Sequence, residues 1–300
     1  MKYQVLLFYK YVLVDDPQAE KQKQLDYFKK YNLKGRMIIA KEGINATLEG
    51  EITDTESYIQ EMSKDKRFAD IHWKKSEGNG KSFPKINIKV RPEIVSLGLK
   101  HDDFDPNQIS GKYITAEELH DLYESGAEFY VIDMRNDYEQ KVGHFESALL
   151  MPMKNFRELP ELIESISHLK DKLVVTTCTG GIRCEKASGF LVKHGFTNVY
   201  QLYGGMHSYI EKYPDQHFKG SLYVFDGRLV WRMNASESAV ISSCEICGDS
   251  SDQYVDCSYL HCKQKRHFIA CDNCRNEDGT VYCSEKCADL AKKSGEIFKP

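Results

Sequence analysis

The sequence predicts an α/β domain in the middle of the chain, with a smaller α+β domain before it and a cysteine-rich module after it. Three observations predict this organisation. Apolar strand-like runs alternate with helical patterns over residues 111–213, which is typical of a parallel sheet with flanking helices. Over residues 1–98 the expected order β-α-β-β-α-β is that of a ferredoxin-like unit. Residues 244–300 hold eight of the ten cysteines.

The composition is that of a globular protein without a membrane anchor. The 300 residues are 41% hydrophobic and 29% charged, which suits two or three domains with cores of their own. The apolar run Val5–Val14 contains a lysine, is too short to span a membrane and lacks a signal-peptide cleavage site. We therefore expect a cytoplasmic protein with reduced thiols that serve catalysis or metal binding. Residues 1–100 are net basic, with 19 Lys and Arg against 14 Asp and Glu, which mildly favours a polyanionic partner.

The first domain is expected to contain four strands and two helices. Asp15-Asp16-Pro17 is typical of a helix start, because Pro suits the first turn and acids stabilise the positive end of the helix dipole. Near the end of the domain, at Lys85–Val90, apolar residues alternate with polar ones, which predicts a strand with one buried face. The expected elements are strands at Tyr3–Val14, Arg36–Ala40, Ala46–Leu48 and Lys85–Val90, a helix after Pro17 and a helix at Thr53–Ser63.

Two stretches of this domain are candidates for function. Lys41-Glu42-Gly43-Ile44-Asn45 is either a hairpin turn or a place where Lys41 and Asn45 bind substrate. A basic stretch with interleaved Trp73 and Phe83 is either a solvated face or a surface where rings stack on bases while cations meet phosphate. Its cations are Lys74, Lys75, Lys81, Lys85, Lys89 and Arg91.

Residues 92–110 are expected to form a polar, proline-broken linker, and the middle domain follows over residues 111–213. Thr115-Ala116-Glu117-Glu118 has the pattern of a capping box at a helix start. Because the sheet is expected to be parallel, functional side chains are expected at the carboxyl ends of its strands. The expected strands are Phe129–Ile132, Leu173–Thr177 and Thr197–Leu202, with a helical pattern at Glu161–Leu169.

Cys178 follows directly after one of these strands. A short Thr-Gly-Gly-Ile loop, Arg183 and a helical pattern come next. In a strand-turn-helix geometry the loop N–H groups and the helix dipole point at the sulfur, which stabilises a thiolate and lowers its pKa. Arg183 would add a fixed positive charge, and Gly180 and Gly181 permit backbone angles that other residues resist. The alternative is a buried core cysteine at the end of a strand.

The last part of the chain is expected to bind metal. Residues 214–243 form a connector with a hairpin that turns at Asp226-Gly227. The module at 244–300 has few large apolar residues, so metal would replace a core that it cannot build. Two Cys₄ zinc sites are our interpretation. The sequence leaves open which pairs combine, whether His261 or His267 replaces a cysteine, and whether the pairs are disulfides. The pairs are Cys244/Cys247, Cys257/Cys262, Cys271/Cys274 and Cys283/Cys287.

Several segments match known families. In the middle domain they are Val131–Arg135, Gly143–Ala148 with Pro152, Cys178–Arg183, and Gly195–Tyr200 with Gly204-Gly205 closing. With these segments the middle domain resembles a rhodanese. The string Cys-Thr-Gly-Gly-Ile-Arg-Cys-Glu-Lys-Ala-Ser, together with Ala40–Asn45, is more specific. It resembles the TrhO (YceA-like) family of bacterial tRNA uridine hydroxylases, over essentially the whole chain. Ala46 stands where we expect Gly in that family.

The resemblance implies an enzyme that uses molecular oxygen to hydroxylate C5 of the wobble uridine of tRNA, forming 5-hydroxyuridine. The family's catalytic cysteine falls on Cys178. Its second motif cysteine falls on Cys184, which would either resolve an oxidised Cys178 or only pack. The sequence shows no motif for flavin or nicotinamide, so we expect Cys178 to attack pyrimidine C6 and leave C5 able to take oxygen. Other expected site residues are Arg183 in catalysis and Thr179, Gly180, Gly181, Ile182, Lys41 and Asn45 in substrate binding.

Three other functions compete with this one. A rhodanese domain also suits sulfur transfer, with a persulfide carried on Cys178, and fold alone does not separate the two. A phosphatase is less favoured, because only four residues between Cys178 and Arg183 make a narrow cradle for a tetrahedral anion. A non-enzymatic RNA- or protein-binding role fits the cysteine-rich tail, whereas the intact Cys178 loop argues against it for the whole chain.

Overall fold

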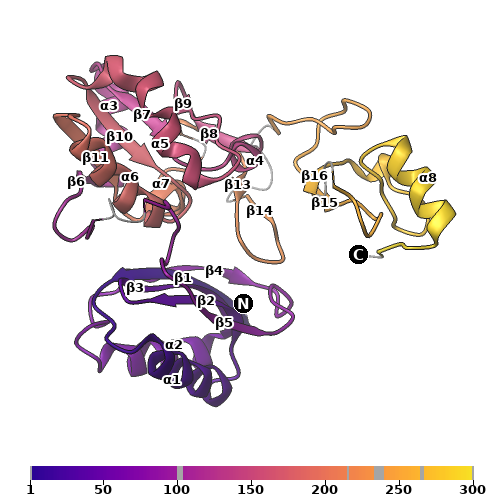
Figure 1. Cartoon of the computed structure of the whole chain (residues 1–300), viewed down its shortest axis with the longest axis horizontal. Coiled ribbons are helices and arrows are strands. Elements are labelled where there is room, and N and C mark those ends of the chain that lie inside the picture. Colours follow the sequence, from indigo (N-terminus) through magenta and orange to yellow (C-terminus); the bar gives the residue numbers. More distant parts are fainter. Residues whose placement is uncertain (1, 100–103, 215, 233–239, 264–266, 299–300) are drawn as a thin grey trace.

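The computed structural model describes residues 2–99, 104–214, 216–232, 240–263 and 267–298. Two α/β bodies lie against each other, and the C-terminal segment extends from the side of the second body (Figure 1). The expected linker at 92–110, connector at 214–243 and module at 244–300 lie partly outside the described residues. No helix in these ranges has both the length and the apolar composition that crossing a membrane requires.

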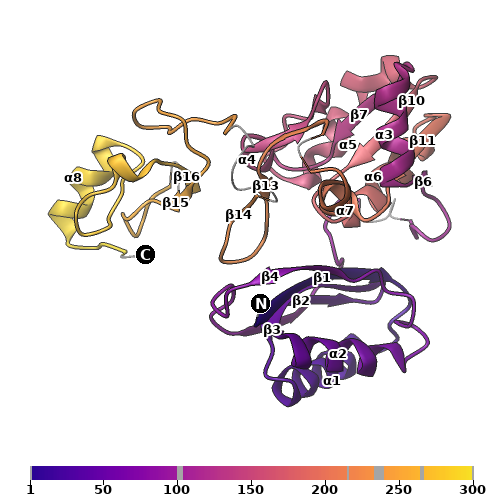
Figure 2. The same ribbon diagram turned by 180° about the vertical axis from the view of Figure 1, so that it is seen from behind.

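The first domain contains β1 (Tyr3–Tyr11), α1 (Pro17–Lys30), β2 (Lys34–Ala40), β3 (Gly43–Glu51), α2 (Ile52–Ser63), β4 (Lys74–Gly78) and β5 (Ile86–Val90). The strands form one sheet in the order β4-β1-β3-β2-β5, with α1 and α2 together on one side of it (Figures 1 and 2). The antiparallel order β4-β1-β3-β2 confirms the ferredoxin-like arrangement. Helix α1 begins where expected, because the Asp16 carboxylate accepts hydrogen bonds from the N–H groups of Gln18 and Ala19.

Two expectations for this domain are wrong. The strand expected at Lys85–Val90 does not close the ferredoxin-like unit: β4 takes that place beside β1, and β5 runs parallel to β2 at the opposite edge. The β4 sequence Lys-Lys-Ser-Glu-Gly has no apolar alternation, so its pattern does not indicate a strand. The rings expected to stack on bases belong to the interior. Phe83 is buried, and Trp73 packs with its ring centroid 4.4 Å from that of Phe8.

The middle domain contains β6 (Lys112–Ile114), α3 (Ala116–Ser125), β7 (Tyr130–Asp133), α4 (Asp137–Gln140), β8 (Gly143–Phe145), β9 (Leu149–Leu150), η2 (Phe156–Glu158), α5 (Leu159–Leu162), η3 (Ile163–Leu169), β10 (Leu173–Thr177), α6 (Ile182–Lys193), β11 (Asn198–Leu202) and α7 (Gly205–Lys212). Its sheet is parallel, in the order β6-β11-β10-β7-β9, as the alternating pattern predicts. One face of the sheet packs against α5, η3 and α6, and the other against α3 and α7. The expected capping box of Thr115 and Glu118 starts α3.

The rest of the chain contains β12 (Phe218–Gly220), β13 (Leu222–Tyr223), β14 (Val230–Trp231), β15 (Tyr254–Asp256), β16 (His267–Ile269), η4 (Asp272–Cys274) and α8 (Glu285–Ser294). Strands β13 and β14 pair as the expected hairpin, and β12 pairs with β8 of the middle domain. The cysteine-rich segment is attached to this hairpin by Asp252, which accepts a hydrogen bond from Ser221 at 2.6 Å and pairs with Arg232.

The helix-free face of the first sheet packs against the middle domain. Along β1, Leu6 and Phe8 are buried in the core of the first domain, whereas Leu7 and Tyr9 point the other way. The Tyr9 hydroxyl donates a hydrogen bond to Glu185 of α6 at 2.8 Å. At another point of the contact, Arg228 of the β13–β14 hairpin donates to the backbone oxygen of Glu77 at 2.8 Å.

A buried lysine joins the two domains. Lys186 of α6 is fully buried, and its Nζ lies 2.9 Å from a carboxylate oxygen of Glu42 and 2.8 Å from one of Glu93. Glu42 lies in the β2–β3 turn and Glu93 follows β5, so both belong to the first domain. Because a buried ammonium is costly unless it is paired, this triad fixes the position of the first domain against α6.

We expect Lys186→Met to lower the free energy of unfolding by about 3 kcal/mol, because it leaves two carboxylates without their cation in a poorly solvated place. Urea unfolding of the full chain measures the change. Lys29→Met, at an exposed lysine of α1, is the control and is expected to change stability by less than about 0.5 kcal/mol. Equal effects of the two substitutions would contradict a structural role for the triad.

Candidate active site

Cys178 lies at the carboxyl end of β10, where the chain turns into α6. The side chain is buried, and its Sγ accepts a hydrogen bond from the backbone N–H of Gly181 at 3.2 Å. Gly181 has φ +98°, a conformation that glycine adopts without strain, and it immediately precedes the first residue of α6. The sulfur therefore lies at the positive end of a helix dipole, as the strand-turn-helix pattern predicts.

The two glycines of the loop allow the first domain to approach the sulfur. A Cβ at Gly181 would come within 2.9 Å of the Tyr9 hydroxyl, and a Cβ at Gly180 would come within 2.9 Å of Leu7 Cδ2. Both contacting residues belong to the helix-free face of the first sheet. The loop sequence is thus fitted to a neighbouring domain as well as to its own turn.

Backbone hydrogen bonds from the start of α7 hold the Cys178 loop in place. The N–H groups of Met206 and His207 donate to the backbone oxygens of Cys178 and Thr179 at 2.9 and 3.0 Å. Gly205 makes this contact possible, because a Cβ there would lie 2.6 Å from the Cys178 oxygen. The loop carbonyls are therefore fixed, which leaves the loop N–H groups turned toward the sulfur.

Three interactions together stabilise the Cys178 thiolate. Burial alone would raise the pKa of the thiol, but a hydrogen bond from the Cys184 thiol, the charge of Arg183 and the N–H groups at the start of α6 outweigh it and bring the pKa to about 6. Burial and the neighbouring Cys178 sulfur raise the pKa of Cys184, so Cys184 stays a thiol. The pair therefore consists of a thiolate and a nearby proton-bearing thiol at neutral pH.

Arg183 supplies the expected positive charge, and its hydrogen bonds go to a buried carboxylate. Its guanidinium forms a bidentate pair with the Glu139 carboxylate at 2.5 and 2.8 Å, and both side chains are buried. Its charge favours the thiolate from there, while its strongest hydrogen bonds go to Glu139. A guanidinium engaged in this way does not present its fork to a phosphate above Cys178, which argues against phosphatase chemistry.

Lys74 is a buried cation. The sequence pattern places it instead in a basic stretch with a solvated face or an RNA-binding surface. Only 3% of the residue is exposed, and its Nζ lies 5.0 Å from the ring centroid of Tyr9. Burial lowers the pKa of Lys74 to about 8, while the charges of Cys178 and Glu185 act in the opposite direction. The first domain thus brings a second positive charge into the field of the thiolate.

A cavity of about 530 Å³ opens above Cys178, with walls from both domains. Of the expected site residues, Cys178, Thr179, Gly180, Ile182, Arg183 and Asn45 line it. Cys184 is buried in the first turn of α6, and Lys41 lies exposed in the β2–β3 turn, away from the cavity wall. Asn45 is held by a hydrogen bond from its Nδ2 to the Ile94 oxygen at 3.1 Å.

Sequence reasoning missed the part of the cavity wall that the first domain and distant loops supply. Tyr9, Arg36, Arg91, Asn136 and Arg157 all line it. Of these five residues, the sequence pattern indicated only Arg91, as a member of the basic stretch. The others lie far apart in the sequence and come together only when the two domains pack.

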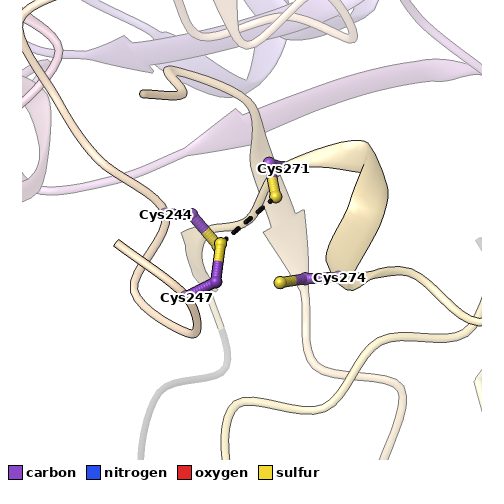
Figure 3. Close-up of side chains that lie close together, drawn as sticks. All are labelled: Cys244, Cys247, Cys271 and Cys274. Atoms are coloured by element: carbon purple, nitrogen blue, oxygen red, sulfur yellow. Dashed lines mark hydrogen bonds between the residues drawn. The ribbon is translucent and has the colours of Figure 1, made fainter. Parts of the chain in front are cut away.

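The eight cysteines of the tail form two groups of four, and this settles the pairing that the sequence leaves open. Cys244, Cys247, Cys271 and Cys274 form one group (Figure 3), and Cys257, Cys262, Cys283 and Cys287 form the other. All eight are free thiols. His261 and His267 contact carboxylates instead, those of Glu296 and Asp256.

The geometry of each group suits a metal ion with four thiolate ligands. Neighbouring sulfurs lie 3.5 Å apart in the first group and 3.6 to 3.7 Å apart in the second. A tetrahedral zinc ion with Zn–S bonds of about 2.3 Å separates its sulfurs by about 3.8 Å. The distances are therefore those of ligands gathered around one ion, and far longer than a disulfide bond of about 2.05 Å.

Three family profiles match successive parts of the chain: the UPF0176 acylphosphatase-like domain at residues 3–94, the rhodanese-like domain at 115–212 and the rhodanese C-terminal domain at 219–288. The last match spans both the β13–β14 hairpin and most of the cysteine-rich segment. Among solved structures, a rhodanese-like domain protein from Staphylococcus aureus is 28% identical, with a TM-score of 0.29, and the match covers 33% of this chain and 90% of that one.

Curated relatives match the whole chain. A protein of Staphylococcus haemolyticus is 43% identical over 293 residues, covering 96% of this chain and 89% of the relative. A protein of Cytophaga hutchinsonii is 40% identical over 285 residues, covering 95% and 89%. Both carry the name tRNA uridine(34) hydroxylase. Because this identity extends over most of this chain and of each relative, the chain belongs to the tRNA uridine(34) hydroxylase family.

Proposed function

We propose that this protein hydroxylates C5 of the wobble uridine of tRNA in the cytoplasm, with Cys178 as the catalytic thiolate and molecular oxygen as co-substrate. The observation that carries the proposal is the position of Cys178: a stabilised thiolate at the wall of a cavity built jointly by both domains. Relatives at 40–43% identity carry the name of this activity.

The thiolate acts as a nucleophile toward the base. Its attack on C6 of uracil forms an S–C6 bond and moves the double-bond electrons toward C5 and O4, which makes C5 electron-rich. C5 then gives this electron pair to molecular oxygen, forming a C5–O bond and a peroxide anion. The proton lost from C5 matches the one that the peroxide takes up, and departure of the Cys178 thiolate from C6 restores the double bond and leaves a hydroperoxide at C5.

Reduction of the hydroperoxide completes the reaction. The Cys178 thiolate takes the outer oxygen as a sulfenic acid, and 5-hydroxyuridine leaves. Cys184 then attacks the sulfenic sulfur, forming a disulfide and releasing water. The two thiols supply the two electrons and two protons that separate a hydroperoxide from an alcohol and water. A cellular thiol reductant returns the disulfide to the resting state. The hydrogen bond between Cys184 and Cys178 supports this resolving role by proximity, and the proton of the Cys184 thiol leaves with the sulfenic hydroxyl as water.

The remaining residues of the site stabilise the thiolate, shape its loop or line the cavity. Arg183 and Lys74 favour the thiolate electrostatically, while Gly180 and Gly181 give the loop its shape. Thr179, Ile182 and Asn45 line the space that the nucleotide would occupy. Lys41 has no place in this proposal, because it lies away from the cavity wall.

We expect Cys178→Ser to lower 5-hydroxyuridine formation by at least about 1,000-fold, because a serine hydroxyl at neutral pH is a far weaker nucleophile than the thiolate. Nucleoside mass spectrometry measures the product in tRNA from a deletion strain complemented with each variant. Binding of tRNA to the purified variant is the control and is expected to persist.

Normal product from Cys178→Ser would remove the thiolate from the mechanism. Unchanged tRNA nucleosides in the deletion strain, with rapid sulfur transfer from thiosulfate by the wild-type protein, would instead favour the persulfide-carrying alternative.

The pH dependence follows from the lowered pKa of Cys178. The thiolate is the reactive form, so we expect alkylation of Cys178 by iodoacetamide to rise with pH, with a midpoint near pH 6, and to level off above about pH 7.5. Peptide mass spectrometry reads this residue separately from the other cysteines. The double variant Arg183→Met/Glu139→Gln removes the charge pair as a unit and is expected to move the midpoint upward. A midpoint near the ordinary thiol value of about 8.5 in the wild type would contradict thiolate stabilisation.

We further propose that the two cysteine groups each hold a structural zinc ion. The small core around Val255, Phe268 and Val281 is completed by the cysteines themselves, which supports a metal as the main stabiliser of this segment. Zinc is favoured over Mg²⁺ and Ca²⁺, which prefer oxygen ligands, because all ligands in both groups are thiolates.

Native protein is therefore expected to release two zinc ions per chain when its thiols are blocked with a mercurial reagent, measured with a zinc-binding dye. Cys274→Ser is expected to lower the count to about one and to make the tail sensitive to protease. Cys184→Ser, at a cysteine outside both groups, is the matched control and keeps two. A metal-free native protein that remains protease-resistant would contradict the proposal.

A further inference from the structure

Two histidines and a glutamate form a cluster on the middle domain, apart from the wall of the Cys178 cavity. His120 and Glu124 belong to α3, and His217 lies between α7 and β12. One metal-binding atom of each side chain lies within 4.8 Å of the corresponding atoms of the other two. None of these three residues lines the Cys178 cavity. The cluster therefore has no place in the proposed hydroxylation chemistry.

Helix spacing and strand pairing together build this cluster. His120 and Glu124 are four residues apart in α3, so they lie on the same face of the helix, one turn apart. His217 immediately precedes β12, which pairs with β8. The backbone N–H of Glu146, which follows β8, donates to the backbone oxygen of His217 at 2.6 Å. This pairing fixes the backbone of His217 and places Glu146 next to it.

Aromatic neighbours hold the two imidazole rings in position. His120 stacks on Tyr213 with ring centroids 4.1 Å apart, and His217 stacks on Tyr123 with centroids 4.4 Å apart. His120 Nδ1 also lies 3.3 Å from the Tyr209 hydroxyl. When this hydroxyl accepts a hydrogen bond from Nδ1, the other ring nitrogen of His120 carries the lone pair that a metal requires. Rings that are already held lose little freedom when an ion binds.

His217 lies between two carboxylates. Its Nε2 is 2.8 Å from Glu124 Oε1, and its Nδ1 is 3.1 Å from Glu146 Oε2. A neutral imidazole has only one N–H, so one of these contacts sets a lone pair against a carboxylate oxygen unless a cation lies between them. That cation is either a proton or a metal ion. Lys219 Nζ, 2.8 Å from Glu146 Oε1, holds Glu146 at the Nδ1 side of the ring.

We propose that His120, Glu124 and His217 bind a divalent transition-metal ion of the zinc class. Glu146 accepts the Nδ1–H of His217 and thereby turns its Nε2 lone pair toward the ion, which is the usual arrangement of a metal-binding histidine. The site is separate from the two cysteine groups and goes beyond the proposed function. The bound ion joins α3 to the segment that leads into β12.

The ligand set and the local charge both suit such an ion. Zinc takes two histidines and one carboxylate as ligands, with a fourth position left for water, and imidazole nitrogen is a poor ligand for Mg²⁺ or Ca²⁺. Bonds of about 2.1 Å to zinc separate tetrahedral ligand atoms by about 3.4 Å, and the Glu124 side chain, 61% exposed, can move by this amount. With neutral rings, the carboxylates of Glu124 and Glu146 outweigh the ammonium of Lys219 and attract a cation.

The test is calorimetric titration of ZnCl₂ into the full chain. The wild-type protein is expected to bind one Zn²⁺ per chain more than Glu124→Gln or His217→Gln binds. Because Glu124 is an exposed residue of α3, its loss of binding cannot be ascribed to a core that fails to fold. His168→Gln, at an exposed histidine of η3, is the matched control and binds as many ions as the wild type. Excess Mg²⁺ is expected not to displace the added zinc.

Glu146 is tested as a positioning residue. Glu146→Gln is expected to weaken binding of the added Zn²⁺ by about 10- to 100-fold, because the glutamine oxygen is a weaker acceptor for the Nδ1–H of His217. The number of ions bound at saturating zinc stays that of the wild type, which separates positioning from direct ligation. An unchanged zinc affinity in this variant would contradict the role of Glu146.

Cobalt distinguishes this site from the cysteine groups. Co²⁺ taken up by the wild-type protein and lost in Glu124→Gln is expected to bind without thiolate-to-cobalt charge-transfer absorption, because the cluster contains no sulfur. Equal zinc counts in the wild type, Glu124→Gln and His217→Gln would overturn the proposal and identify His217 as a protonated bridge between two carboxylates. Because ion binding is read without tRNA, failure of the proposed hydroxylation would leave this test unaffected.

Discussion

The ion triad of Lys186, Glu42 and Glu93 is the constraint on which the rest of the site depends. It is buried at its centre, and it joins α6 of the middle domain to two segments of the first domain. The same helix begins beside Cys178, so the triad fixes the first sheet relative to the sulfur. The loop glycines face Leu7 and Tyr9 of that sheet. The cavity is therefore a product of domain packing, to which the triad contributes together with the Tyr9–Glu185 and Arg228–Glu77 hydrogen bonds.

The two distant sequence strings that carry the family resemblance meet in the triad. Ala40–Asn45 contains Glu42, and the Cys178–Ser188 string contains Lys186, and in the fold these two residues touch. The first string is the hairpin turn that its glycine predicts, joining β2 to β3. Its role is nevertheless structural contact through Glu42 and a cavity wall through Asn45, with Lys41 left in solvent. The hairpin-turn interpretation of that stretch is thus confirmed, and substrate binding by Asn45 stays a prediction.

Local features of this chain were predictable and long-range ones were not. The strand, glycine turn and helix around Cys178 follow from a few adjacent residues, as do the Asp16 cap and the alternation of the parallel sheet. Strand β4 was not predicted, because its polar sequence has no apolar alternation and its position depends on long-range contacts with β1 and Arg228. The bond between Tyr9 and Glu185 joins residues 176 positions apart, which no periodicity encodes. The partnership of Arg183 with Glu139 was hidden for the same reason.

The charge balance of the site separates stabilisation from recognition. Arg183 and Lys186 are buried and paired with carboxylates. The charge of Arg183 therefore acts at the Cys178 loop, and the charge of Lys186 acts at the contact between the two domains. Lys74 is buried beside Tyr9 and acts on the thiolate. Arg36, Arg91 and Arg157 are exposed and unpaired with described residues, and this is the state in which a cation binds a diffusing polyanion best, because no internal partner must first be displaced. The cations that tune the sulfur are thus distinct from the cations available to an anionic ligand, and a change in one set need not disturb the other.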